Sequence, residues 1–274
     1  MAALRSELSK LYRQRITWAS FGIVLVLVGL ITWGSHHEQG RLDVSERLGP
    51  QFVVAGKSVT ALFVANAVMQ VALAVLMPLL IAVVVGGLVA GERQSGTLRS
   101  LLSRPVARWR VLAAKLATSW AFTIALTLFL GLTGLGLGQL VFGWGDLVVL
   151  GRGLTIFEPQ TGLARLAQSY ALACLAMCSV ATLALMLSTI FNNPMTAAGL
   201  TVAVLLVSQI VGAMPYFEAI EPHLITAHLD IHREVLAATV DVASLRTSAA
   251  YLAGYIAAAG IIALVVFDRR DVTC

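Results

Sequence analysis

Residues 166–217 read LAQSYALACLAMCSVATLALMLSTIFNNPMTAAGLTVAVLLVSQIVGAMPYF, a stretch without any Asp, Glu, Lys or Arg. One helix needs only ~20 largely apolar residues to cross the hydrocarbon core of a bilayer, so this stretch is long enough for two crossings. Asn192, Asn193 and Pro194 lie near its middle. Proline lacks a backbone N–H and asparagine favours turns. The stretch therefore predicts two membrane spans, at about 166–190 and 195–214, joined by a short turn.

Four further uncharged stretches are each long enough for one span. The composition agrees, because 58% of the residues are hydrophobic and only 12% are charged, which does not suit a soluble fold. The first stretch could also belong to a cleaved signal peptide, but its length and the lack of a clear A-x-A-like site favour a retained span. We expect an all-α integral membrane protein with six transmembrane helices, forming a single domain over residues 1–274. The four additional spans are expected at about 16–34, 64–90, 116–142 and 247–267.

The distribution of Lys and Arg predicts the orientation. In a six-span arrangement, the side that holds both termini carries 12 of the 19 basic residues with 4 acids, and the other side carries 7 with 10 acids. Because positive residues resist translocation, the basic side should be cytoplasmic, with the N- and C-termini inside and the protein in the inner (plasma) membrane. The basic pI is then explained by topology and by the lipid bilayer as a partner, and gives no case for nucleic acid.

The segment before the first span has a helical pattern. Leu8 and Leu11 recur at helical spacing, and Arg5, Lys10 and Arg13 point elsewhere. The pattern predicts an amphipathic helix over about 1–15, lying in the inner interface. A frayed basic tail is the alternative.

The longest cytoplasmic loop, at about 91–110, carries the strongest functional signal. Leu98, Leu101 and Leu102 fall at i, i+3 and i+4, which places them on one face of a short helix that Pro105 would end. A leucine face outside the membrane needs a cover. That cover is either a cytoplasmic protein or the inner leaflet itself.

This loop resembles the signature loop of ABC transporter type-2 permeases, the six-span subunits that work with a separate ATPase. The matching pattern is E-x-x-x-G-T-L-x-x-L-L-S-x-P-V-x-R, followed by a Lys seven residues on. The similarity extends to the N-terminal helix, the span count, the turn at Asn192 and the C-terminal Phe-Asp-Arg-Arg-Asp-Val. The residues that it marks for ATPase coupling are Glu92, Gly96, Thr97, Leu98, Arg99, Leu101, Leu102, Ser103, Arg104, Pro105 and Arg108.

The resemblance implies a function and its partners. Residues 97–104 would form a coupling helix that docks on a cytoplasmic ABC ATPase, and Glu92 would pair with Arg5, Lys10 or Arg13. ATP and Mg would bind to the ATPase, so this chain would hold no cofactor and would not be an enzyme. Two copies, or this chain and a homologous permease, would form the dimer of a bacterial exporter. The uncharged spans suggest a hydrophobic or amphipathic substrate, such as a drug, a lipid-like molecule or an antimicrobial peptide.

Other functions are less well supported by the residues. A complex that handles metal or passes mechanical work to an outer partner is the main alternative. An intramembrane enzyme or a proton-coupled transporter would need ionisable groups at membrane depth, and no expected span carries one in its interior.

Two residue pairs are weak metal candidates. His228 and His232 lie four apart in the last outer loop, where one helix could present both imidazoles, but a solvated polar loop is the simpler interpretation. Cys174 and Cys178 lie four apart in the fourth span, where packing is the usual role of cysteine.

Two features of the remaining sequence leave their structure open. Gly134 and Gly138 form a G-x-x-x-G pattern, which fits packing within the chain as well as packing between two copies. The segment 143–165 is expected to be irregular, and the loop 215–246 has helical patterning around 224–242.

Overall fold

The computed structural model describes residues 2–37, 59–96, 107–150, 154–217 and 219–269. Within these ranges, six helices are long and apolar enough to cross a membrane, which confirms the predicted all-α membrane fold. The spans are α2 (Arg15–His37), α4 with η1 and α5 (Ala61–Val71, Ala72–Leu76 and Met77–Gln94), α7 (Arg108–Phe142), α8 (Pro159–Ile190), α9 (Pro194–Gly212) and α12 (Val242–Arg269). A further helix, α1 (Ala2–Arg13), precedes them.

Most of the helices are longer than the uncharged stretches that predicted them. Helix α7 has 35 residues, or ~52 Å at 1.5 Å per residue, against ~30 Å for a hydrocarbon core. Charged residues therefore belong to the helices where these leave the core. Helix α5 continues to Gln94 and α7 begins at Arg108, so the loop between them is shorter than the expected 91–110.

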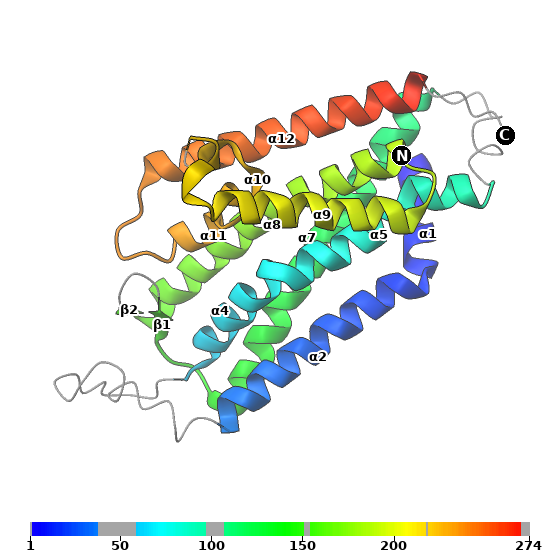
Figure 1. Cartoon of the computed structure of the whole chain (residues 1–274). Helices are drawn as coiled ribbons and strands as arrows, with labels where there is room; N and C mark the ends of the chain where they lie inside the picture. The colour runs from blue at the N-terminus through cyan, green and yellow to red at the C-terminus, as the bar shows by residue number, and fades with distance from the viewer. Residues whose placement is uncertain (1, 38–58, 97–106, 151–153, 218, 270–274) are drawn as a thin grey trace.

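The two ends of the bundle differ (Figure 1). Helix α1, the end of α5, the start of α7 and the end of α12 lie together at one end, here called the basic end. A β-hairpin lies at the opposite end, here called the hairpin end, with β1 (Leu147–Leu150) antiparallel to β2 (Leu154–Phe157). The segment expected to be irregular thus contains a regular hairpin, because two runs of apolar and β-branched residues flank a Gly-Arg-Gly connection.

Small residues allow the central helices to approach closely. A Cβ added at Gly138 would lie 2.9 Å from Ala61 Cα, and one at Gly134 would lie 3.3 Å from Ala65 Cα. Both glycines therefore pack against α4 of the same chain, which answers the open question about the G-x-x-x-G pattern. The span to which α4 belongs contains a π-helical segment, η1, between α4 and α5.

A compact cap connects α9 to α12. It consists of η2 (Pro215–Phe217), η3 (Glu221–His223), α10 (Ile225–Leu229) and α11 (Ile231–Glu234), which pack on α8, α9 and α12. The expected helical pattern is thus broken into short pieces. The cap buries Ile225 and Ile231, so it is part of the folded core and not a solvated loop.

Candidate functional site

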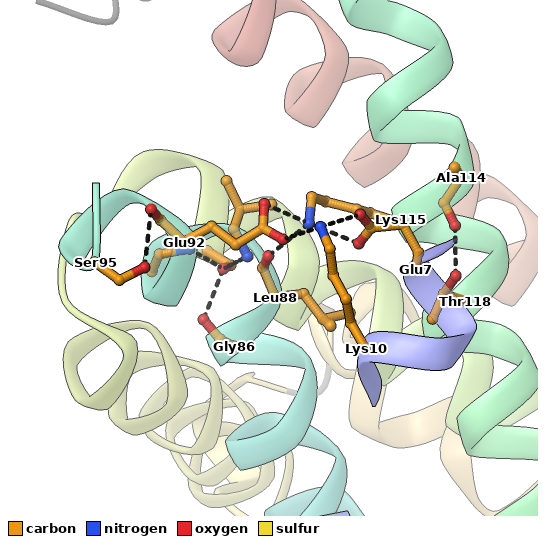
Figure 2. Close-up of polar contacts among 12 residues, drawn as sticks. Glu7, Lys10, Gly86, Leu88, Glu92, Ser95, Ala114, Lys115 and Thr118 are labelled. Carbon is orange, nitrogen blue, oxygen red and sulfur yellow. Dashed lines mark hydrogen bonds and ion pairs between the residues drawn. The ribbon is translucent and has the colours of Figure 1, made fainter. Parts of the chain in front are cut away.

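Four charged side chains form a closed ring at the basic end of the bundle (Figure 2). Helix α1 contributes Glu7 and Lys10, α5 contributes Glu92, and α7 contributes Lys115. Lys10 Nζ lies 2.8 Å from Glu7 Oε1 and 2.9 Å from Glu92 Oε1. Lys115 Nζ lies 2.8 Å from Glu7 Oε2 and 2.8 Å from Glu92 Oε2. Each lysine bridges both carboxylates, so the charges alternate around the ring and sum to zero.

Lys115 is the buried member of this charge ring. Its side chain has 0% exposure, against 7% for Glu7, 17% for Glu92 and 43% for Lys10. Its ammonium also donates to the backbone oxygen of Leu88 at 2.9 Å. The ammonium thus donates hydrogen bonds to Glu7 Oε2 and Leu88 O and forms an ion pair with Glu92 Oε2. Burial of a charge is costly unless it is paired and hydrogen-bonded, and the ring meets both conditions.

The ring also shifts the pKa values of the two α1 residues. Burial alone would raise the pKa of Glu7, but the Lys115 charge and the hydrogen bonds from Lys10 and Lys115 outweigh it, so the pKa lies below its usual range. Burial alone would lower the pKa of Lys10, but its hydrogen bonds to Glu7 and Glu92 outweigh that effect and raise the pKa. Both groups are therefore held in their charged forms.

The last turn of α8 and the short turn that joins it to α9 also hold α5. Ser188 Oγ donates to Gly86 O at 2.6 Å and accepts from the backbone N–H groups of Val89 at 3.1 Å and Ala90 at 3.0 Å. Arg93 Nη1 donates to Thr189 O and to Asn192 Oδ1. A Cβ at Gly86 would lie 3.1 Å from Ala198 N, so α9 also packs closely here. The last turns of α5 are thus fixed by the charge ring and by this turn.

The two ends of the loop between α5 and α7 are also defined. Gly96 follows the end of α5 with φ 72°, in the left-handed region that ends many helices. At the other end, Arg108 Nη1 donates to Asp268 O at 2.9 Å, which joins the start of α7 to the last turn of α12. Cationic groups at a helix C-terminus bind its unpaired carbonyl oxygens well.

The structure places only some of the residues suggested by the family resemblance. Of the three candidates for pairing with Glu92, Lys10 makes the contact, while Arg5 and Arg13 are exposed and form no ion pair with the described residues. Eight coupling residues lie outside the described residues: Thr97, Leu98, Arg99, Leu101, Leu102, Ser103, Arg104 and Pro105.

Sequence reasoning missed Glu7 and the central place of Lys115. Glu7 is the one acid in an otherwise basic helix and lies three residues before Lys10, a spacing that marks neighbours on a helix surface. The family pattern includes Lys115, but the expected third span, 116–142, begins one residue after it. The structure puts it inside α7, with a fully buried side chain.

The two histidines of the cap, His228 and His232, are buried and contact protein groups. His228 lies in α10 and His232 in α11, so the two imidazoles do not share one helix. His228 contacts Ser248 Oγ through Nδ1 and Pro222 O through Nε2, and its ring stacks on Tyr251 at 4.5 Å. Both of its nitrogens thus have protein partners. The expectation of a solvated loop is wrong here, because the cap folds over both side chains.

The second pair of metal candidates lies in the bundle. Cys178 is buried in α8 and Cys174 is half-buried one turn earlier. Among the described residues, no group of three His, Cys, Asp or Glu side chains is arranged to hold a metal ion.

The fold and the charge ring define a class: a membrane protein of six apolar helices with a buried polar junction at one end. The loop between α5 and α7 begins and ends near this junction. Over residues 1–272 the chain matches the family described as ABC-2 family transporter protein, and it belongs to that family. The resemblance seen in the sequence is thereby confirmed. The chain is also 27% identical, over 207 residues, to the uncharacterized protein YhcI of Bacillus subtilis (strain 168). The alignment covers 69% of this chain and 63% of that protein, less than two thirds of its length.

Proposed function

We propose that this chain is the membrane-spanning subunit of an ATP-driven exporter, with ATP hydrolysis on a separate cytoplasmic ATPase. The basic end would face the cytoplasm in the inner membrane, with both termini inside. Two copies, or this chain and a homologous permease, would form the membrane unit. ATP and Mg would be held by the ATPase. Family membership supports the proposal, because it makes the chain a transporter subunit.

The observation that carries the proposal is the ion pair between Glu92 and Lys115. Glu92 lies near the end of the helix that enters the loop, and Lys115 lies near the start of the helix that leaves it. Their 2.8 Å contact, together with Glu7 and Lys10, ties α5, α7 and α1 into one unit. A force applied to residues 97–104 by an ATPase would therefore move three helices together.

The substrate class follows from the spans that would surround its path. The uncharged stretches contain no Asp, Glu, Lys or Arg, so a path between them would be apolar. Such a path favours a hydrophobic or amphipathic substrate, such as a drug, a lipid-like molecule or an antimicrobial peptide. The charged residues of α7 lie in its first turns, outside these uncharged stretches, so such a path offers no charge to attract a small ion.

A pull-down with a cytoplasmic ABC ATPase, sought first in the neighbouring reading frames, would test the proposal. The double variant Leu101→Asp/Leu102→Asp should lose the ATPase, because it places two charges on the leucine face. Ile156→Asp is the matched control, since it changes an exposed apolar residue of β2 at the hairpin end. It should retain the ATPase. Equal retention by the double variant would overturn the proposal.

Transport needs a separate measurement. Inverted vesicles that contain the complex should take up a lipophilic dye in an ATP-dependent manner, and a Walker-lysine variant of the ATPase should abolish uptake. ATP hydrolysis without uptake, together with co-purification of an outer protein, would instead support the transfer of mechanical work.

A further inference from the structure

An apolar cavity of about 370 Å³ lies between α7, α8 and α12, near the basic end. Trp109, Leu112 and Leu116 of α7 line it together with Thr182 of α8 and with Gly260 and Leu264 of α12. Its volume lies at the low end of the range for small-molecule pockets, ~300–1,000 Å³. The cavity therefore suits one hydrocarbon chain better than a whole lipid.

The cavity opens to the outside of the bundle and does not favour water. Trp109 is 60% exposed and Leu264 is 39% exposed, so these two residues stand at its mouth. The hydroxyl of Thr182 already donates to Cys178 O at 2.8 Å and accepts from Trp120 Nε1 at 3.0 Å. An apolar cavity without free polar groups stays dry, but an unfilled one forfeits the dispersion contacts of its walls. A hydrocarbon chain would restore those contacts.

A positive charge lies beside the mouth. The guanidinium carbon of Arg110 is 5.4 Å from the centre of the Trp109 ring, and the side chain is exposed. One turn beyond Leu264 on α12, Asp268 O accepts the hydrogen bond from Arg108. Two arginines, Arg108 and Arg110, therefore lie close to the residues at the mouth.

The depth of the cavity fits the part of a lipid nearest its headgroup, in the leaflet at the basic end of the bundle. Along α7 it extends from Trp109 to Leu116, a distance of ~10 Å at 1.5 Å per residue. Tryptophan is enriched at the level of the lipid headgroups, so Trp109 fits the interface and Leu116 fits the region of the acyl chains.

We propose that this cavity binds an anionic glycerophospholipid, with one acyl chain between α7, α8 and α12 and its phosphate on Arg110. In a membrane the surface around the cavity is covered by lipid, so a lipid chain is the occupant already at hand. Inside a bilayer, the hydrophobic effect does little to favour moving an acyl chain from the lipid into the cavity, because both surroundings are apolar. The fit of the chain and the attraction of the anionic headgroup to Arg110 therefore provide the selectivity. The inference needs only that the chain spans a membrane, so it stands or falls separately from export.

Native mass spectrometry of the full chain in detergent tests the site, with phosphatidylglycerol and phosphatidylcholine of identical acyl chains as the probes. Gly260→Leu fills the cavity, and an added Cβ at Gly260 meets no heavy atom within 4 Å. Gly254→Leu is its matched control, since Gly254 lies on the same helix, has equally open space and does not line the cavity. Arg110→Gln removes the charge, and Arg13→Gln removes an exposed arginine from α1 as its control.

The expected result is one retained phosphatidylglycerol on the wild type and on both controls. Gly260→Leu should release both lipids. Arg110→Gln should weaken the binding of phosphatidylglycerol about fivefold, the factor that corresponds to ~1 kcal/mol per basic residue at a membrane surface. It should leave the binding of phosphatidylcholine unchanged. Equal binding of the two lipids by the wild type would overturn the proposal. Unchanged retention by Gly260→Leu would do the same. A loss of dimer mass in place of lipid mass would show that a second copy covers the cavity.

Discussion

Lys115 and Glu7 are 108 positions apart in the chain, yet Lys115 Nζ lies 2.8 Å from Glu7 Oε2 where the lysine has no exposed surface. This contact fastens α1 to α7. With only 12 residues, α1 is short enough to be marginal as an isolated helix in water, so its stability depends on such tertiary contacts. The buried face of α1, which includes Leu11, completes the attachment.

Removal of the buried ammonium of Lys115 should lower the stability of the fold more than removal of the more exposed ammonium of Lys10. Lys115→Met leaves Glu7 and Glu92 without their buried partner, and the loss of one member of a buried pair costs ~3–5 kcal/mol. Lys10→Met should cost at most ~1 kcal/mol, because the Lys10 side chain is 43% exposed and is partly solvated. The melting temperature in detergent, followed by fluorescence-detected size exclusion, should therefore fall much further for Lys115→Met. Equal losses would contradict the view that burial sets the strength of the ring.

The contribution of Glu7 to stability should depend on pH at the acid side. Its pKa is lowered in the folded state from 4.5. Its contribution is therefore complete above that value and is lost as the pH falls through the lower folded pKa. The difference in melting temperature between the wild type and Glu7→Gln should be constant at neutral pH and should shrink below pH 4.5. A difference that does not change with pH would show that Glu7 acts through shape and not through charge.

The contribution of Lys10 to stability should depend on pH at the alkaline side. Its pKa is raised from 10.5, so its contribution is complete below that value and is lost as the pH rises through the higher folded pKa. Lys10→Gln should therefore differ from the wild type by a constant amount until the pH passes 10.5, where the two curves should converge. Convergence that begins near neutral pH would contradict the raised pKa.

Much of the fold could be predicted because lipid leaves a strong signal in composition. Every spanning helix must be apolar over ~20 residues, and the five uncharged stretches, one of them long enough for two spans, record that requirement directly. The charge ring leaves no such signal, since Glu7 and Lys115 meet only after α1 packs on α7. The burial of His232 was missed for the same reason, because it depends on how the cap folds onto α8. The hairpin could have been predicted from the sequence, because residues 147–157 show two apolar runs around Gly-Arg-Gly.

The close approach of α4 and α7 predicts a clear difference between two neighbouring glycines. Gly138→Ala places a Cβ 2.9 Å from Ala61 Cα, a backbone atom that cannot move aside by rotation, and overpacking of this kind costs ~1–3 kcal/mol. Gly136→Ala meets no heavy atom within 4 Å and should be neutral or slightly stabilising, since alanine favours helix. The two melting temperatures should move in different directions or by clearly different amounts. Equal effects would imply that α4 and α7 separate in the membrane.

Ser188 tests whether the end of α8 helps to transmit movement from α5. Its hydroxyl contacts three backbone groups of α5, at Gly86, Val89 and Ala90. Ser188→Ala should cost ~1–3 kcal/mol, the penalty for leaving buried polar groups unsatisfied. Ser179→Ala is the matched control, because Ser179 is equally buried in α8 but bonds only to Ala176 O of its own helix.

The two serine variants should also differ in function if α5 carries the force. Substrate-stimulated ATP hydrolysis by this chain reconstituted with the proposed ATPase should fall in Ser188→Ala at temperatures where the variant remains folded. It should be unchanged in Ser179→Ala. A purely structural role would lower the melting temperature of Ser188→Ala and leave the stimulation ratio intact. The stimulation ratio therefore separates a contact that merely stabilises α5 from one through which movement of α5 reaches α8 and α9.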